Sequence, residues 1–537
     1  MSKQSVVKHS AIAAVLAASM GFTACATDLT ESPRDILTAD NLFVDAAGFD
    51  AAVNGLYAQV RQERQGSTSS SNNIRSQFWT LGTDVAWSLL VDPATQFYNG
   101  WGSLANPSFT VNLSMWTWLY QTINAANAVI GRAENPDVRW TEAQKNRTVA
   151  EARLIRAWAY RHLTYSWGDV PLTLEESSGT SVRTDWERTP IAEVRKQMEE
   201  DLLFAEAVLP ETTPDAARVS KAVAQHYLAE LYLAMDQPAK AEASAEAVIN
   251  SGAYHLITER YGIRASQPGV PFMDQFLDGN VNRDQGNTEA LWTFQYELKT
   301  VGGGNSVMRR HWLNRYWSLG GVALSVENGG RGVGYNAPTA WAINNYEPQD
   351  DRGSQFAIRK YYIYNTTAGL PQGKAIGDTV YLKWVEGTET STSWDWPSVA
   401  KWEWADPANL AGSGSFGDEP YLRLAETYLL AAEAEMKQGK LDEAADHINI
   451  VRRRAHASDI TPAQVTLDFI LDERARELLT EENRRYTLVR TGTWFERTRK
   501  YNPVAGPNIA EFNKLYPIPQ AVIDSNLGAE MPQNPGY

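Results

Sequence analysis

Apolar residues recur every three or four positions over long stretches of this chain, a spacing that places them on one face of a helix. A first helix is expected over residues 39–64, with Phe43, Phe49, Val53 and Tyr57 on its apolar side. The pattern therefore predicts a mainly α-helical protein. Further helices are expected over residues 114–131, 141–166, 190–209, 220–235 and 238–250.

Two of these helices form a pair with a short turn, and a second pair of the same kind follows much later in the chain. Pro238, a residue favoured at the first turn of a helix, opens the second helix of the first pair. In the second pair, 421–436 and 441–451, only Gly439 breaks the helical period. Small alanines and short turns are typical of tetratricopeptide-type units, although the full repeat consensus is not met. The expected fold class is mainly α, with a tetratricopeptide-like scaffold of helical pairs.

The region between the two pairs has a different character. Short alternating stretches at 289–296, 357–364 and 379–385 predict a few strands, and the loops between them are rich in Gly and Trp. Because long loops of this kind in a compact protein are usually functional, we expect an irregular ligand-face insertion. The chain is accordingly divided into an N-terminal helical part with an aromatic loop at 79–108, the insertion, and a C-terminal helical part, at residues 41–250, 251–420 and 421–537.

The N-terminus is typical of an exported lipoprotein. Lys3 and Lys8 precede an apolar run at 11–20, which is too short to span a membrane as a helix. Cys25 follows the small Thr23 and Ala24, so we expect a signal peptide at 1–24, lipidation of Cys25 and a tether at 25–40. The alternative is ordinary cleavage after Ala26, which would discard Cys25.

Charge and cysteine usage exclude several classes of partner and site. The chain has 49 basic and 64 acidic residues, and a net charge of -15 repels nucleic acid and anionic lipid surfaces. Cys25 is the only cysteine, so no disulfide and no thiol-based metal or redox site is expected. Asp278, Asn280, Asn282 and Asp284 alternate like calcium ligands, but Arg283 stands where a calcium loop needs Gly. No metal, cofactor or catalytic residue is therefore predicted.

Several sequence blocks follow one another in a fixed order. They are Glu151 to Trp158 followed by Trp167-Gly168-Asp169-Val170-Pro171-Leu172, Arg423 to Glu426 with Ala432 to Ala434, Glu473-Arg474 with Glu477-Leu478, Glu482, Arg485 and Arg490, Leu515 to Pro519, and Gln533 to Tyr537. Together they resemble the SusD/RagB family of nutrient-binding lipoproteins, over nearly the whole mature chain. The charged residues of 473–490 are expected to pair across the scaffold.

The resemblance implies a location, a partner and a function. A family member of this kind lies on the outer membrane surface, held by its lipid, beside a SusC-like TonB-dependent transporter. It binds an oligosaccharide or another nutrient, passes it to that transporter and does no chemistry on it. The chain is therefore expected to be a non-catalytic glycan-binding protein that contacts the membrane only through its lipid.

Aromatic residues in two loops are the candidate ligand contacts, because a sugar needs flat aromatic surfaces with polar groups at their edge. No motif fixes the individual positions, and packing in the scaffold is the alternative for each of them. Substituting Trp101 or Trp317 by alanine is expected to weaken glycan retention with little loss of thermal stability. The candidates are Trp87, Tyr98 and Trp101 in the first loop and Arg310, Trp312, Asn314, Tyr316, Trp317, Tyr335 and Trp341 in the second.

Two other functions remain open at this stage. A glycoside hydrolase would use the same aromatic cleft and would release products. A peptide-binding tetratricopeptide scaffold would hold its ligand in the helical groove, and the aromatic loops would then be incidental.

Overall fold

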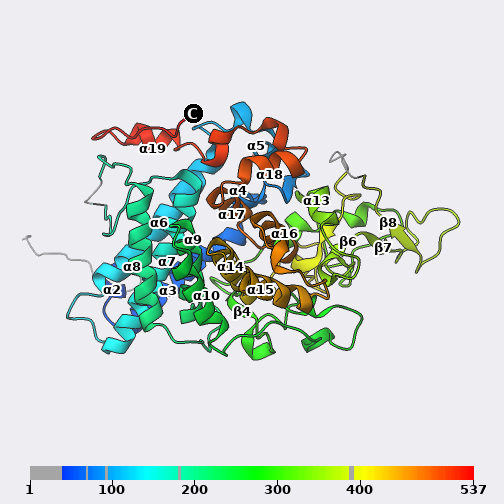
Figure 1. The fold of residues 1–537 in the computed structure, drawn as a ribbon, viewed down its shortest axis with the longest axis horizontal. Coiled ribbons are helices and arrows are strands. Elements are labelled where there is room, and N and C mark those ends of the chain that lie inside the picture. The colour runs from blue at the N-terminus through cyan, green and yellow to red at the C-terminus, as the bar shows by residue number, and fades with distance from the viewer. Residues whose placement is uncertain (1–38, 68–69, 91–94, 180–182, 386–391) are drawn as a thin grey trace, which may run out of the picture.

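The scaffold is a continuous succession of packed helices, and the predicted mainly α class is confirmed (Figure 1). The computed structural model describes residues 39–67, 70–90, 95–179, 183–385 and 392–537. The predicted signal peptide, Cys25 and almost all of the tether lie outside these residues. The scaffold helices are α3 (Ala46–Arg61), α6 (Thr110–Arg132), α7 (Glu142–Trp167), α8 (Ile191–Val208), α9 (Lys221–Ala234), α10 (Pro238–Ile249), α14 (Leu424–Lys437) and α15 (Leu441–Arg454).

Each scaffold helix packs on its neighbour in chain order, and the two predicted pairs lie side by side. Helix α6 packs on α7, α7 on α8, α8 on α9 and α9 on α10. Helix α10 then packs directly on α14, although the whole insertion separates them in sequence. The insertion therefore leaves the succession of helices unbroken and lies to one side of it, at the right of Figure 1.

Local capping groups explain where several helices begin and end. Thr141 and Gln144 form a reciprocal capping box at the start of α7, and Gly168 ends this helix with a φ of 76°. The expected single helix at 39–64 is instead α2 (Ala39–Leu42), α3 and a short 3-10 turn. The reason is Asp45, whose carboxylate accepts a hydrogen bond from Gly48 N at 3.1 Å and so starts a new helix.

The strands occur only as two-stranded antiparallel pairs in the described residues. Strand β4 pairs with β10, so the part of the insertion between them, residues 295–418, starts and ends at neighbouring points. Helix α14 begins at Leu424 rather than at the predicted 421 because 419–423 is this strand. The pairs are β1 (Gly66–Ser67) with β2 (Ser70–Ile74), β3 (Ala86–Ser88) with β5 (Asn336–Pro338), β4 (Ala290–Phe294) with β10 (Glu419–Arg423), β6 (Ile358–Arg359) with β9 (Ser398–Val399), and β7 (Tyr361–Ile363) with β8 (Thr379–Tyr381).

Shorter helices complete the insertion and the C-terminal part. Helix α17 packs on α7 and on α4, so the end of the chain closes back on the N-terminal part. In the described residues, no helix has the length and apolar character needed to cross a membrane. These helices are α4 (Gln77–Thr80), α5 (Gln96–Gly100), α11 (Pro271–Asp274), α12 (Met308–Trp312), α13 (Ala340–Asn344), α16 (Leu467–Glu477), α17 (Arg484–Arg490), α18 (Trp494–Tyr501) and α19 (Gln520–Ser525).

A buried ion network joins α16 to the insertion and to α15. Glu477 lies at its centre: Arg352 donates to it at 3.1 Å, Arg423 donates to it at 3.0 Å, and Arg454 is its third partner. All four side chains are at most 1% exposed. The predicted pairing of the charged residues of 473–490 is therefore confirmed for Glu473, Glu477, Glu482 and Arg490, whereas Arg485 lies over aromatic rings and donates to Asn513 O. The network extends to Glu289, Asp350, Arg452, Glu473 and Glu481.

Candidate ligand-binding surface

The two predicted aromatic loops meet in the structure, although only through a short segment of each. Strand β3 of the first loop pairs with β5 of the second, with Trp87 opposite Ala337. The backbone of Leu89 also donates a hydrogen bond to Tyr335 O at 2.8 Å. Residues 86–90 of the first loop therefore border the second loop, whereas its Gly82, Asp84 and Trp101 contact the C-terminal part.

Most of the predicted ligand contacts are instead core residues. Trp101 is fully buried, with its ring centroid 5.4 Å from that of Trp494 and 5.8 Å from that of Tyr516. A side chain enclosed in this way presents no ring face to a ligand, so packing, the alternative that the sequence left open, describes these positions. The predicted residues that are at most 3% exposed are Trp87, Tyr98, Trp101, Trp312, Asn314 and Tyr316.

Hydrogen bonds explain why two of these polar positions turn inward. The Asn314 amide donates to Trp396 O at 2.9 Å and accepts from the Tyr362 hydroxyl at 2.7 Å. Tyr316 donates to Gly330 O at 2.7 Å. These bonds satisfy buried polar groups that would otherwise be costly, and they tie the loop together from inside.

Trp341 belongs to a separate cluster on α13. Its ring stacks on Tyr501 with centroids 4.2 Å apart, and the Arg497 guanidinium lies 5.2 Å from its ring centroid. The side chain is half-buried. Trp341 is therefore not brought together with the other predicted contacts of its loop.

A half-buried group of arginines and aromatic rings remains at the surface of the insertion, and we call it the arginine-tryptophan surface. It consists of the half-buried Arg310, Arg315, Trp317 and Arg331 and of Tyr335, which is 6% exposed and lies beneath Arg310. The guanidinium carbons of Arg315 and Arg331 lie 4.6 and 5.6 Å from the Trp317 ring centroid. Arg310 lies 5.4 Å from the Tyr335 ring centroid and donates to its hydroxyl at 3.3 Å.

The backbone of residues 331–335 holds this surface together. Trp317 Nε1 donates to Gly332 O at 2.9 Å, and the amides of Val333 and Gly334 donate to Arg310 O at 3.2 and 3.3 Å. Only glycine fits at position 332, because a Cβ there would lie 2.3 Å from Leu313 O. The segment therefore lies close enough to bring side chains from both of its ends onto one surface.

Several positive charges lie together in this region, although the chain as a whole is acidic. Beneath the surface, burial lowers the pKa of Arg309 to about 10, Tyr316 opposes this shift, and the positive charges of Arg310 and Arg331 add to it. Arg309 is held by the carbonyl oxygens of Trp404 and Gly414, at 2.6 and 3.2 Å. The arginines at 309, 310, 315 and 331 thus gather positive charge in a protein whose net charge is -15.

Sequence reasoning missed Arg315 and Arg331. Arg331 lies in a glycine-rich stretch that gives no periodic signal, and Arg315 lies beside Tyr316, whose side chain points inward. The aromatic content of the loop was the only available signal, and it did not distinguish exposed positions from buried ones.

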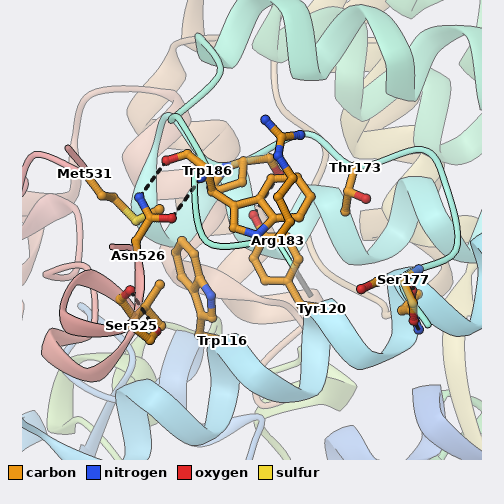
Figure 2. A pocket seen from close by; sticks show the side chains of 12 residues that line it. Trp116, Tyr120, Thr173, Ser177, Arg183, Trp186, Ser525, Asn526 and Met531 are labelled. Atoms are coloured by element: carbon orange, nitrogen blue, oxygen red, sulfur yellow. Dashed lines mark hydrogen bonds between the residues drawn. The ribbon is translucent and has the colours of Figure 1, made fainter. Parts of the chain in front are cut away.

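A separate aromatic pocket of about 300 Å³ lies on the opposite side of the molecule, between α6, the segment joining α7 to α8, and α19 (Figures 1 and 2). Trp116 and Tyr120 of α6 form one wall, and Trp186 faces them from the connecting segment. Sequence reasoning placed Trp116 and Tyr120 on a scaffold helix, assigned no role to Trp186 and did not predict a pocket here. The other lining residues are Asn124, Pro171, Thr173, Ser177, Arg183, Val522, Ser525, Asn526 and Met531.

The amide groups of this pocket already have partners. Asn526 accepts from Trp186 N and donates to Trp186 O, both at 2.8 Å, as the dashed lines in Figure 2 show. Asn124 exchanges a similar pair of bonds with Ser177, at 2.7 and 3.2 Å. Tyr120 donates to Pro171 O at 2.8 Å. The pocket therefore offers aromatic surface, but much of its hydrogen-bonding capacity is committed to the protein.

Two groups of residues of metal-ligand type have protein partners. His447 joins α15 to α10 and α14, with its ring nitrogens 3.1 Å from Glu246 and 2.9 Å from Glu435. In the loop considered for calcium, the Asn280 side-chain oxygen accepts from Ile263 N at 2.9 Å and that of Asn282 accepts from Gln295 at 2.7 Å. Both asparagine oxygens are thus occupied by protein donors.

Comparison with known proteins gives consistent matches along the chain. A family model described as "SusD family" matches residues 288–537, and one described as "Starch-binding associating with outer membrane" matches residues 46–233. SusD-like protein P2 of Formosa agariphila is 28% identical over 95% of this chain and 96% of its own length. Starch-binding protein SusD of Bacteroides thetaiotaomicron is 36% identical over 26% of each chain. The solved structure of a laminarin-binding SusD-like protein, at 22% identity, shares the fold with a TM-score of 0.70 over 91% of this chain and 99% of that chain.

Proposed function

This chain belongs to the SusD family, and on that basis we propose that it captures glycans at the cell surface by binding them without chemical conversion. One matching family model is described as starch-binding, and two of the similar proteins are named for binding starch and laminarin. These names support a saccharide ligand for this chain, and the arginine-tryptophan surface is the place we assign to it.

The observation that carries the proposal is the half-buried Trp317 with two guanidinium groups beside it. A sugar ring has an apolar C-H face and a rim of hydroxyls, so it is bound well by flat groups that lie next to hydrogen-bond donors. Guanidinium groups are themselves flat and carry five donors each. The hydrogen bond from Trp317 to Gly332 fixes the ring in place before a ligand arrives.

The aromatic pocket fits a sugar less well because its amide groups already form hydrogen bonds within the protein. Each ring hydroxyl that leaves water needs a new partner, and an unpaired polar group costs about 1–3 kcal/mol. The side-chain amides of Asn124 and Asn526 already form hydrogen bonds with the segment that forms the opposite wall. The arginine-tryptophan surface places two guanidinium groups beside one half-buried ring, which favours it as the glycan site.

Binding without catalysis is supported by where the strongly shifted carboxylates lie. Burial by itself raises the pKa of Glu473, but nearby arginines, Arg352 first among them, outweigh burial and lower it to about 2. Glu473 belongs to the buried ion network and not to the ligand surface. Hydrolases place such groups in a cleft, so we expect no shortened saccharides after incubation with an oligosaccharide panel.

Substituting Trp317 by alanine is expected to weaken glycan retention by roughly 2- to 30-fold, the equivalent of about 0.5–2 kcal/mol for lost cation-π and stacking contacts. The variant should keep nearly the wild-type unfolding midpoint because the side chain is only half-buried. Affinity electrophoresis in gels that contain single glycans measures the effect.

Trp186→Ala is the matched control, because this tryptophan is also half-buried but lies in the aromatic pocket. It should leave glycan retention unchanged. The opposite result, loss of retention in Trp186→Ala and none in Trp317→Ala, would move the glycan site to the pocket.

We also propose that the mature chain is anchored to the outer membrane through a lipid on Cys25 and delivers its ligand to a SusC-like transporter. The support is the sequence around Cys25 and the family model described as associating with the outer membrane. Fatty-acid labelling is expected in the wild type and not in Cys25→Ala. A barrel protein should co-purify with the wild type in mild detergent, and labelling that persists without Cys25 would contradict the anchor.

A further inference from the structure

Among the described residues, Arg315 and Arg331 lack the carboxylate partner that Arg260, Arg352 and Arg359 of the insertion have, and Arg264, Arg283 and Arg309 lack one as well. Arg359 pairs with Glu403 at 2.6 Å, and Arg260 pairs with Asp274 at 2.7 Å. Arg315 and Arg331, in contrast, have no carboxylate within 4.0 Å among the residues that the structure describes. In an acidic protein, where carboxylates are plentiful, two neighbouring cations without one leave a local excess of positive charge.

The side chains of Arg315 and Arg331 form few hydrogen bonds with the described residues. Arg331 donates to Ala411 O at 3.4 Å, a long bond. The Nε atom of Arg315 is buried and has no hydrogen-bond partner. An unmet donor on a charged side chain is costly, and an anion at the terminal N-H groups of the same guanidinium would offset part of that cost.

Both cations are held beside the same tryptophan ring. Both lie within 5.6 Å of the Trp317 ring centroid, which attracts positive charge through its π face. Of the two, Arg331 also acts on Arg309, since burial first and then the charges of Arg310 and Arg331 lower the Arg309 pKa. The surface is therefore preorganised for a ligand that brings negative charge.

We propose that the saccharide bound at this surface is acidic, carrying carboxylate or sulfate groups that Arg315 and Arg331 bind. This inference rests on the glycan-capture function proposed above and adds the charge class of the ligand. Guanidinium groups match carboxylate and sulfate oxygens with paired hydrogen bonds, and such charge-assisted bonds are about twice as strong as neutral ones. A neutral glucan offers no group that would use them in this way.

The net charge of the chain makes salt dependence a sharp test. With a net charge of -15, the protein as a whole repels an acidic polymer. Added salt would weaken that repulsion, and it would raise the affinity if no local cationic site took part. If the two arginines make the contact, salt screens an attraction instead and lowers the affinity. The sign of the salt effect therefore reports on the local site.

The experiment measures binding of the full-length chain in mild detergent to polygalacturonate, to a sulfated galactan and to laminarin, at low and high NaCl. We expect at least one acidic polymer to bind about ten-fold more tightly than neutral laminarin at low salt, and to weaken as salt rises. Retention by only one of the two acidic polymers identifies carboxylate or sulfate as the source of the charge.

Substitutions then locate the effect. Arg315→Ala and Arg331→Ala should each lower acidic-glycan affinity about ten-fold, and the corresponding lysine variants should recover part of it because they keep the charge. Arg453→Ala is the control, since that exposed arginine on α15 pairs with Asp459, away from the insertion. Unchanged unfolding midpoints show that each variant is folded.

The outcomes separate the two proposals. Equal or tighter binding of laminarin, or arginine variants that affect neutral and acidic glycans alike, would overturn the acidic-ligand inference and leave glycan capture standing. Failure of the wild type to bind any glycan, acidic or neutral, would overturn the proposed function itself.

Discussion

Replacing Glu477 by glutamine is expected to destabilise the protein by about 3–5 kcal/mol, the usual cost of removing one partner from a buried charge cluster. Glu477 accepts hydrogen bonds from Arg352, Arg423 and Arg454, and none of these side chains is more than 1% exposed. A neutral amide of the same size leaves their positive charges without compensation in the core. Chemical denaturation measures the loss.

Glu134→Gln is the control for this substitution. Its carboxylate pairs with Lys145 at 2.9 Å, but the Glu134 side chain is 70% exposed, so water and salt screen the pair. No measurable change in stability is expected. A Glu477 variant as stable as this control would show that the network contributes nothing to the folded state.

The same network predicts how stability responds to acid. The pKa of Glu473 is lowered from 4.5 to about 2, and the charges of Arg454, Arg423 and Arg352 also hold the pKa of Glu477 below its ordinary range. A lowered folded-state pKa stabilises the protein above the unfolded-state pKa. The free energy of unfolding should therefore fall as the pH drops from about 4.5 toward 2, and a flat profile over this range would contradict the assignment.

Trp101→Ala is expected to cost about 3–5 kcal/mol of stability, as for other buried tryptophans cut to alanine. The ring is fully buried among Trp494, Tyr516 and Phe97, and its Nε1 donates to Tyr98 O at 3.0 Å. Packing around it is tight, since a Cβ on Gly82 would lie 2.9 Å from that nitrogen. This reverses the expectation from sequence, in which Trp101 contacted the ligand.

Chemical denaturation and glycan retention, measured together, distinguish the two roles of Trp101. Trp317→Ala serves as the comparison because its side chain is half-buried at the ligand surface. A Trp101 variant that keeps its stability and loses only glycan retention would restore the role predicted from sequence.

The helices could be predicted because the residues that a helix buries in the core recur along the sequence with the period of the helix itself. Residues 141–166 were expected as a helix, and α7 runs from Glu142 to Trp167. The boundaries that shifted did so for local reasons, such as Asp45 capping α3 and a strand preceding Leu424. Periodicity and capping thus accounted for most of the scaffold.

The ligand surface could not be predicted at the same level because burial in irregular segments has no period. Trp101 and Trp312 lie in segments rich in Gly, Ser or polar residues, which suggested exposure, yet tertiary packing buries both. Arg331 reaches Trp317 only because the backbone at Gly332 passes close to Leu313. Such approaches depend on the completed fold, so composition located the insertion but not the residues exposed on it.

The pairing of β4 with β10 affects how readily the sequence of the insertion can change in evolution. Because this pair places Phe294 opposite Glu419, residues 295–418 start and end at neighbouring points, while α10 and α14 remain in contact. Closing a flexible loop costs only about 0.6 kcal/mol more for each doubling of its length. The loops of this segment that lie away from the β3–β5 pair and from the buried ion network can therefore lengthen, shorten or exchange surface residues at small cost to the helices, so ligand preference can diverge on one helical frame.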